Sequence, residues 1–268
     1  MTTLPFYWVD AFTDRVFSGN PAGVCPVETW PSDEQLQRIA WQNGLAETAF
    51  HRRIADDRFE LRWFTPGTEI DLCGHATLAP AHVLYRELGY DAPAVFFETR
   101  SGTLVVRPRG SERMELDFPA RPATAVTQSE TLSVLTKALG TPAPDWVGKA
   151  RDYLIVVPTA EEVRTLRPDL GALTAGGIES LIVSAPGEAN NCDFVSRFFA
   201  PGFGVPEDPV TGSAHCTLVP YWAGRLGRTD LHARQLSARG GELWCQLKGE
   251  RVRIAGRAAT YLVGEIRF

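Results

Sequence analysis

The chain reads Arg62-Trp63-Phe64-Thr65-Pro66-Gly67 in its first half and Arg197-Phe198-Phe199-Ala200-Pro201-Gly202 in its second. Each copy leads into a loop with acidic side chains, and then into Gly-His-Ala at Gly74 or Gly-Ser-Ala at Gly212, where an apolar helix begins. A repeated strand, loop and helix predicts two similar half-domains that face each other. A cleft between them would hold a small anion, because the first backbone N–H groups of a helix have no partner within it.

The composition is that of a soluble globular protein. The 268 residues are 44% hydrophobic and 22% charged, and the formal net charge is −5. This charge gives no general attraction to nucleic acid or to anionic lipid. No apolar run approaches the roughly 18 residues that span a bilayer, and the N-terminus lacks a signal peptide. We therefore expect a cytoplasmic protein with neither a nucleic-acid nor a membrane partner.

The cysteines and histidines show no metal-binding pattern. Five cysteines are scattered without a C-x-x-C pair, which is typical of buried reduced thiols. The five histidines lack the spacing of a zinc site, so no metal is expected. The glycine-rich motifs that bind nucleotide phosphates are also absent. The sequence thus predicts neither a metal nor a nucleotide.

The helices that follow Gly74 and Gly212 are apolar on most sides. Such a helix is surrounded by protein, so we expect each half to wrap its strands around one central helix. Most other segments are predicted to be short strands, and the fold class is therefore α+β. Pro80 and Pro220 are expected in the first helical turn, where proline is tolerated. Phe118 to Pro122 is the best candidate linker, which gives halves of 1–120 and 121–259.

The second loop combines a carboxylate, two hydroxyls and a glycine at the start of a helix. Asp208 and Ser213 are candidate catalytic residues, and backbone N–H groups from Gly212 to Ala214 could bind a carboxylate. The alternative is a purely structural cap, in which Ser or Thr accepts hydrogen bonds from the first turn. The matching loop in the other half favours a functional role.

The first loop offers Cys73 and His75 beside Gly74 and Ala76. A histidine at a helix N-terminus is expected to be neutral, because the positive end of the helix dipole opposes the imidazolium. Glu47 is the third catalytic candidate, since its small and apolar neighbours make ionisation costly, as suits a general acid or base. The repeated Arg62 and Arg197 are expected to pair with carboxylates and to be structural.

Several motifs of the chain resemble those of a known family. The resemblance rests on motifs spread along the whole chain: Asp10-Ala11-Phe12-Thr13, Phe17-x-Gly19-Asn20-Pro21-Ala22, Glu47-Thr48-Ala49-Phe50, Arg62-Trp63-Phe64-Thr65-Pro66, Cys73-Gly74-His75-Ala76-Thr77 and Glu207-Asp208-Pro209-Val210-Thr211-Gly212-Ser213-Ala214. Together they resemble the phenazine-biosynthesis PhzF-like isomerases, which share the diaminopimelate-epimerase fold. The resemblance implies two pseudo-symmetric, barrel-like halves, with the last strand, 260–268, returning to the first half. It also implies no cofactor and a homodimer.

The resemblance also implies roles for individual residues. Glu47 takes the position of the family's general acid/base, and His75, Asp208 and Ser213 those of the other active-site residues. The expected substrate-binding residues are Asn20, Cys73, Gly74, Ala76, Gly212 and Ala214. The implied reaction moves a carbon-bound proton on a small, cyclic or amino, carboxylic acid.

The residue that precedes the motif glycine, Gly74 or Gly212, distinguishes two possible mechanisms. Epimerases of this superfamily usually have a cysteine there in each half, and the two thiols exchange a proton with opposite faces of the substrate. Here the first half has Cys73 but the second has Thr211, whose alcohol cannot replace a thiol. An epimerase or racemase that uses Cys73 with another partner is therefore the second hypothesis. A small-molecule-binding protein without turnover is the third.

Overall fold

The computed structural model describes residues 1–140, 144–188 and 191–268 of the chain. The chain forms two compact units. The first unit comprises Met1–Asp117 and Ala255–Phe268, and the second comprises Phe118–Ile254. The sequence predicts halves of 1–120 with 260–268, and 121–259.

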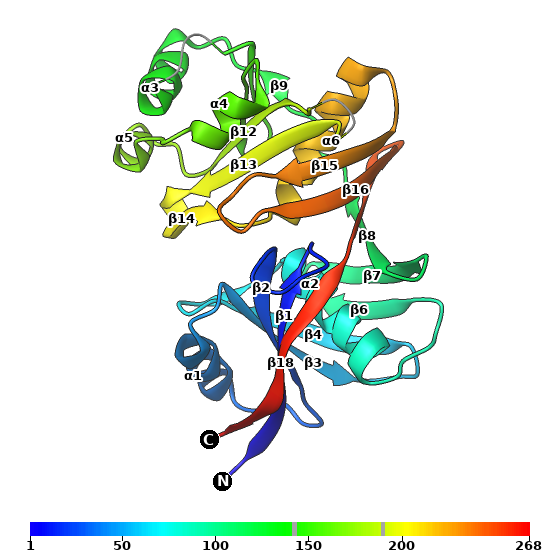
Figure 1. Ribbon diagram of the computed structural model, residues 1–268. Coiled ribbons are helices and arrows are strands. Elements are labelled where there is room, and N and C mark those ends of the chain that lie inside the picture. Colours follow the sequence, from blue (N-terminus) through cyan, green and yellow to red (C-terminus); the bar gives the residue numbers. More distant parts are fainter. Residues whose placement is uncertain (141–143, 189–190) are drawn as a thin grey trace. The chain divides into compact units, whose positions relative to one another are not determined.

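The first unit is a mixed sheet that curves around a helix (Figure 1). Its strands follow the order β18-β1-β2-β3-β4-β6-β7-β8, in which β2 with β3 and β4 with β6 are parallel and the other pairs are antiparallel. The strands are β1 (Thr3–Ala11), β2 (Asn20–Pro26), β3 (Glu47–Arg53), β4 (Arg58–Phe64), β5 (Glu69–Ile70), β6 (Val95–Thr99), β7 (Gly102–Arg109), β8 (Arg113–Pro119) and β18 (Ala258–Arg267).

Helix α1 (Asp33–Asn43) is capped at both ends by neighbouring residues. The Ser32 hydroxyl accepts from the backbone N–H of Gln35, and the Gln35 side chain accepts from Ser32 in return. Gly44 ends the helix in the left-handed conformation, with φ of 62°. Leu36 and Ile39 face inward and join Phe50 in a buried apolar cluster. Local capping and an apolar stripe are therefore enough to explain this helix.

Helix α2 (His75–His82) runs through the first unit and packs against β1, β2 and β3. All eight of its residues are buried, as an all-round apolar helix requires. The chain then continues as a π-helical turn, η1 (Val83–Glu87), in which Leu88 N–H donates to Val83 O at 3.0 Å. This turn extends the axis of the buried helix toward the far ends of β2 and β3.

The second unit repeats the pairing pattern of the first. Strand β10 is antiparallel to β11, β11 parallel to β12, β12 antiparallel to β13 and β13 parallel to β15, as for the β1-β2-β3-β4-β6 series. Its strands are β9 (Thr124–Ala125), β10 (Trp146–Lys149), β11 (Tyr153–Val156), β12 (Leu181–Pro186), β13 (Phe194–Ala200), β14 (Val205–Asp208), β15 (Asp230–Gln235), β16 (Gly241–Lys248) and β17 (Arg251–Gly256). The repeated motif therefore reflects a repeated topology.

The helices of the second unit include a buried one that corresponds to α2. Helix α6 (Gly212–Leu226) packs against β15 and β16, with nine of its residues buried. Thr159 caps α4 (Ala160–Thr165) by accepting from Glu162 N–H. The helices are α3 (Ser129–Leu139), α4 (Ala160–Thr165), α5 (Leu170–Ala175), the short 3-10 turn η2 (Pro201–Phe203) and α6 (Gly212–Leu226). Among the helices of the described residues, none is long and apolar enough to cross a membrane.

The two helix prolines do not lie in the first turn, so that prediction is wrong. Pro80 and Pro220 lie inside α2 and α6, where each lacks the N–H that would bond the carbonyl four residues earlier. Those carbonyls are satisfied from outside the helix. Ala76 O accepts from the Trp63 indole at 2.9 Å, and Cys216 O accepts from Arg121 N–H at 2.8 Å. In both units, a donor from outside the helix thus takes the place of the N–H that proline lacks.

Candidate active site

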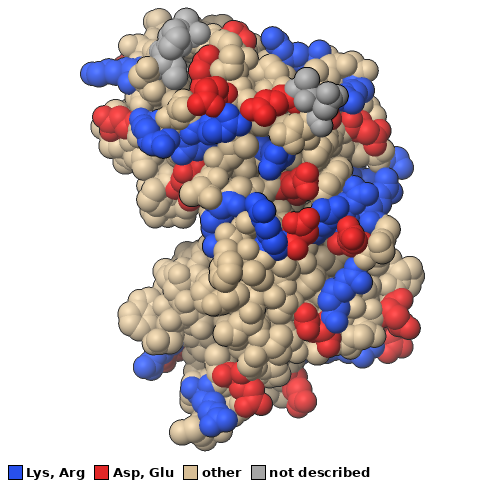
Figure 2. Space-filling view, in the orientation of Figure 1, with Lys and Arg blue, Asp and Glu red and all other residues tan. Residues whose placement is uncertain are grey.

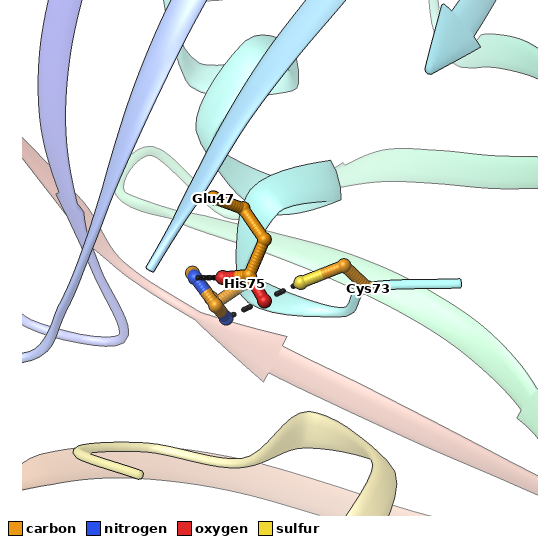
Figure 3. Close-up of side chains that lie close together, drawn as sticks. All are labelled: Glu47, Cys73 and His75. Carbon is orange, nitrogen blue, oxygen red and sulfur yellow. Dashed lines mark hydrogen bonds and ion pairs between the residues drawn. The ribbon is translucent and has the colours of Figure 1, made fainter. Parts of the chain in front are cut away.

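Three acid/base side chains meet at the start of α2 in the first unit (Figure 3). Oε2 of Glu47 lies 2.9 Å from Nε2 of His75, and Sγ of Cys73 lies 3.4 Å from Nδ1 of the same ring. The side chains of Glu47 and His75 are 15% and 5% exposed, so the pair is largely removed from water. Of the predicted site residues, the structure brings Glu47, Cys73 and His75 into direct contact.

Neighbouring parallel strands position two of the partners of His75. Glu47 is the first residue of β3 and Asn20 the first of β2, and these strands pair so that Ala22 faces Glu47. Nδ2 of Asn20 lies 3.1 Å from Nδ1 of His75. In the neutral ring, Nδ1 accepts from this amide nitrogen and the ring proton lies on Nε2, toward Glu47. In the imidazolium, Nδ1 carries a proton and faces the amide oxygen of Asn20 instead. Asn20 therefore contacts the ring on the side away from the carboxylate.

The prediction that His75 is neutral is wrong. Burial opposes the imidazolium, but the Glu47 carboxylate and the hydrogen bonds with Cys73 and Glu47 outweigh it, and the pKa of His75 is raised above its ordinary value. The helix dipole considered alone left out these neighbours, one of which lies 28 residues away in the sequence. Protonated His75 would present N–H groups on both sides of its ring.

Cys73 is a protonated thiol at neutral pH. Burial raises the pKa of Cys73, and the nearby Glu47 carboxylate raises it further, while His75 and the backbone N–H of Ala76 act in the opposite direction. Only the thiolate is a good base or nucleophile. Cys73 is therefore placed to donate a hydrogen bond or a proton and is poorly suited to removing one from carbon.

The N-terminus of α2 has no capping side chain. Gly74 is the N-cap residue and makes no side-chain bond, while its carbonyl accepts from the N–H groups of Thr77 and Leu78. The donors before them, on Gly74 and His75, point away from the helix and are not bonded to backbone acceptors within the described residues. They are suitable donors for a substrate carboxylate next to Glu47.

The same three side chains are also metal-ligand types. One potential donor atom from each of Glu47, Cys73 and His75 lies within 4.8 Å of the others. However, Glu47 faces Nε2 of the imidazole and Cys73 faces Nδ1, so the two partners flank different nitrogens of one ring. One ion can bind only one of these nitrogens. The arrangement is better suited to proton transfer through the ring than to holding a metal.

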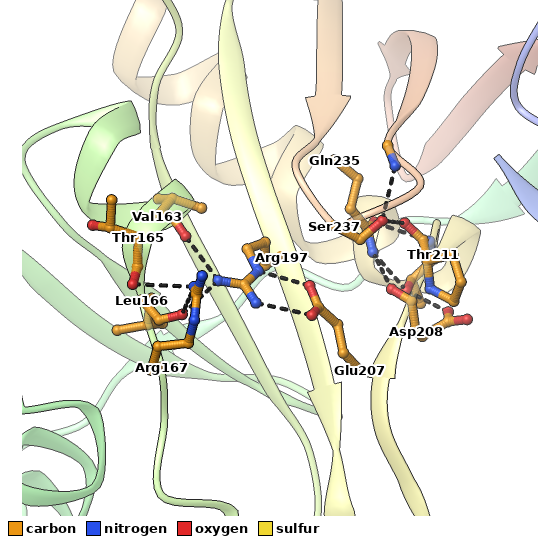
Figure 4. Close-up of polar contacts among 12 residues, drawn as sticks. Val163, Thr165, Leu166, Arg167, Arg197, Glu207, Asp208, Thr211, Gln235 and Ser237 are labelled. Atoms are coloured by element: carbon orange, nitrogen blue, oxygen red, sulfur yellow. Dashed lines mark hydrogen bonds and ion pairs between the residues drawn. The ribbon is translucent and has the colours of Figure 1, made fainter. Parts of the chain in front are cut away.

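A second polar group surrounds Asp208 in the second unit (Figure 4). The Thr211 hydroxyl donates to Oδ2 of Asp208 at 2.5 Å, and Thr211 N–H donates to Oε1 of Gln235 at 2.9 Å. The Gln235 amide donates in turn to Asp208 O at 2.8 Å. Thr211 holds the N-cap position of α6 but makes no capping bond with its side chain. The simple capping explanation therefore does not account for this loop.

Ser213 is half-buried in the first turn of α6. Its neighbours Gly212 and Ala214 are buried, as is His215, whose Nδ1 donates to Thr211 O at 2.8 Å. Ser213 thus lies at the start of the helix, beside the backbone N–H groups that could bind a carboxylate.

The repeated arginines are structural, as predicted. Arg62 donates two hydrogen bonds to Glu69, at 2.7 and 2.8 Å, and Arg197 donates two to Glu207 at the same distances. Arg197 also donates to the carbonyls of α4 at Val163 and of the adjacent Leu166 (Figure 4). Each pair fixes the loop that leads to the helix carrying the site residues.

One residue of this group, Gln235, was not anticipated from the sequence. It lies at the end of β15, 24 residues beyond Thr211, and is brought there because β15 pairs with β13. No motif surrounds Gln235, so the sequence alone offers no signal. Its three hydrogen bonds to the loop, two with Thr211 and one to Asp208 O, hold Thr211 beside Asp208.

Known proteins share this architecture. The sequence model of the phenazine biosynthesis-like protein family, PhzC-PhzF, matches residues 9–264. An uncharacterised isomerase from Pseudomonas aeruginosa is 50% identical over 266 residues, which cover 98% of each chain. A PhzF-family phenazine biosynthesis protein from Enterococcus faecalis, known from its crystal structure, is 42% identical and covers 100% of both chains with a TM-score of 0.94.

More distant structures share the fold alone. A hydroxyproline epimerase from Agrobacterium vitis is 10% identical and has a TM-score of 0.63, covering 98% of this chain and 92% of that one. These similarities confirm the predicted α+β fold of the diaminopimelate-epimerase type. The match of the family sequence model over nearly the whole length confirms the resemblance noted in the motifs. The chain therefore belongs to the phenazine biosynthesis-like protein family.

Proposed function

We propose that this protein is a cofactor-independent isomerase that moves a carbon-bound proton on a small carboxylic acid. One observation carries the proposal. Oε2 of Glu47 and Nε2 of His75 lie 2.9 Å apart, and both side chains are largely removed from water. A buried carboxylate and imidazole in contact are typical of an acid–base site.

In the proposed reaction Glu47 removes a proton from one carbon and returns it to another. His75, as the imidazolium, stabilises the negative charge that develops on the substrate. Asn20 and the Cys73 thiol hold the other side of the ring, so that Nε2 stays directed at Glu47. Every proton that leaves carbon returns to it, so the reaction is redox-neutral and needs no cofactor.

The substrate class follows from the helix terminus beside Glu47. A carboxylate at Gly74 and His75 would accept backbone hydrogen bonds and would lie against the positive end of α2. Ala76 completes this first turn. Asp208 and Ser213, with the backbone of Gly212 and Ala214, stay in the proposal because they occupy the repeated motif. The P. aeruginosa relative carries the name isomerase, which supports this class of reaction.

The test is a screen of cyclic and amino carboxylic acids for enzyme-dependent deuterium uptake from heavy water. We expect Glu47→Gln to lower uptake by about 10²–10⁴-fold, because general acid–base catalysis contributes that much. Glu34→Gln, which removes an equal charge from an exposed helix position, should leave the rate unchanged. EDTA should have no effect. Full exchange by Glu47→Gln would remove Glu47 from the mechanism.

An epimerase or racemase that uses Cys73 is the second candidate. It is favoured by the 3.4 Å contact between the Cys73 thiol and His75. Against it, Thr211 occupies the second position and donates to Asp208. We expect iodoacetamide to leave turnover nearly intact, because the Cys73 thiol is buried and protonated. Rapid inactivation that substrate prevents would favour the epimerase. A ligand that binds tightly without any deuterium exchange would instead indicate a binding protein.

A further inference from the structure

The first unit contains a second pocket at the opposite ends of the strands that carry the catalytic candidates. Its volume is about 370 Å³. Its lining includes Val27, His51, Phe59, Leu84, Leu88 and Tyr90. Glu47 and His51 point to the same face of β3, because side chains alternate along a strand. They are four residues apart, which is about 13 Å along the strand. The pocket is thus separate from the cluster around His75.

His51 is the unexplained group in this pocket. Its side chain is 3% exposed, and neither Nδ1 nor Nε2 has a hydrogen-bond partner within the described residues. A buried imidazole normally bonds through at least one nitrogen, because an unpaired buried polar group is destabilising. The backbone of His51 is ordinary, since its carbonyl accepts from Val27 N–H at 2.9 Å. The unpaired side chain of His51 therefore indicates that a hydrogen-bonding partner is missing from this pocket.

The walls of the pocket are aromatic and apolar. Phe59 meets His51 edge-on at 5.7 Å between ring centroids, and Tyr90 meets Phe59 edge-on at 5.9 Å. The Tyr90 hydroxyl donates to Ala94 O at 2.8 Å, so Tyr90 presents its ring to the pocket rather than its polar end. Leu84 adds an aliphatic wall from the π-helical turn. These surfaces suit a flat apolar ring.

The buried polar group of the pocket is neutral. Burial lowers the pKa of His51 to about 4, so at neutral pH the ring offers one donor and one acceptor. Arg53 and Asp91, of opposite charge, also line the pocket. The Arg53 guanidinium donates to the carbonyls of Ala55 and Asp56 and lies over the Phe59 ring, 6.0 Å from its centroid. A neutral hydroxyl matches such an imidazole better than a carboxylate does, because a carboxylate would enter the apolar depth uncompensated.

We propose that this pocket binds a small phenolic compound, with its ring against Phe59, Tyr90 and Leu84 and its hydroxyl bonded to His51. The occupant is defined by one aromatic ring and one hydroxyl group. The site is not part of the proposed isomerase reaction, and it does not depend on that reaction being correct.

Phenol is the probe, and benzene is its partner without the hydroxyl. We expect phenol to bind the full-length protein with a dissociation constant on the order of 1 mM, as a ligand of this size allows. Benzene should bind at least tenfold more weakly. The measurements are an NMR titration that follows the His51 ring nitrogens, and calorimetry.

Two variants locate the site. His51→Phe should weaken phenol binding at least tenfold and remove the preference over benzene. Leu88→Trp fills the mouth from a position that is 48% exposed, so it keeps the protein folded and should abolish binding of both probes. Leu226→Trp is the matched control: Leu226 is 40% exposed and precedes a left-handed glycine, as Leu88 does, and binding should be unchanged.

The outcomes are distinct from those of the isomerase test, because no turnover is measured. Phenol binding that Leu88→Trp abolishes and Leu226→Trp preserves supports the site. Equal affinity for phenol and benzene, no binding of phenol up to 20-fold above the expected constant of about 1 mM, or wild-type binding by Leu88→Trp would each overturn the proposal.

Discussion

At the scale of single residues, burial has opposite consequences for different histidines. His51, His82 and His215 are buried without an adjacent carboxylate strong enough to compensate, and burial lowers the pKa of each to about 4. His75 is equally buried but contacts Glu47, and its pKa is raised. The partner of the imidazole, rather than its depth, decides its charge.

These shifts predict how stability depends on pH. A histidine of lowered pKa is fully stabilising above about pH 6.5, and this contribution is lost as the pH falls toward 4, because the unfolded chain binds the proton first. Each of these three histidines lowers the free energy of unfolding by up to about 1.4 kcal/mol per pH unit as the pH falls from 6.5 toward 4. His75 has the opposite sign, and its contribution is lost only above pH 6.5.

The measurement is urea unfolding at several pH values between 6.5 and 4. The free energy of unfolding should fall steeply with acid. His51→Gln should reduce the slope by about 1.4 kcal/mol per pH unit, since it removes one of the three groups. An unchanged slope in that variant would show that His51 is not buried in neutral form.

At the scale of elements, the two buried helices share an unusual device. Each contains an interior proline, and each replaces the lost helical bond with a donor from elsewhere in its own unit: the Trp63 indole for Ala76 O, and Arg121 N–H for Cys216 O. A proline inside a helix otherwise costs about 3 kcal/mol. The donors explain how the central helices tolerate Pro80 and Pro220.

Trp63→Phe should therefore destabilise the first unit by about 1–3 kcal/mol beyond the effect of ring size, because the buried Ala76 carbonyl loses its partner. Trp30→Phe is the control. It loses an indole bond to Glu60 that is partly exposed, and should cost less than about 1 kcal/mol. Urea unfolding of both variants gives the comparison, and equal losses would contradict the role of Trp63.

The elements also show which structural features can be predicted from the sequence. The ends of α1 follow from Ser32, Gln35 and Gly44, which act on their immediate neighbours. The repeated motif led to Cys73 and His75 because it marks where a loop meets a helix, and the small and apolar neighbours of Glu47 led to that carboxylate. The positions of the prolines, the charge of His75 and the role of Gln235 depend on partners distant in sequence. Such partners are supplied by strand pairing, which no local pattern specifies.

At the scale of the whole molecule, the first unit has an apolar patch made by Phe17, Tyr261 and Val263, which are 70%, 47% and 60% exposed. Phe17 contacts Tyr261 at 5.5 Å between ring centroids. Phe17 also has a φ of 67°, which is uncommon for a bulky residue, and Asp10 accepts its N–H at 2.9 Å. Figure 2 shows that the face over β1 and β18 has few charged side chains.

We propose that a second copy of the chain covers this apolar patch in a homodimer, since contiguous exposed apolar side chains are typical of interfaces. Val263→Glu should convert the dimer into a monomer, as measured by sedimentation velocity. Leu226→Glu, at an exposed leucine outside the patch, should leave the dimer intact. A Val263→Glu protein that sediments as the wild type does would exclude the patch.

The pairing of the first and last strands has a consequence for biosynthesis. β1 and β18 are neighbours, and Thr2 and Phe268 exchange two backbone hydrogen bonds, while the entire second unit is encoded between them. On the ribosome, β1 must wait for β18. The nascent chain therefore carries an open sheet edge until β18 has emerged, and chaperones have reason to engage it there.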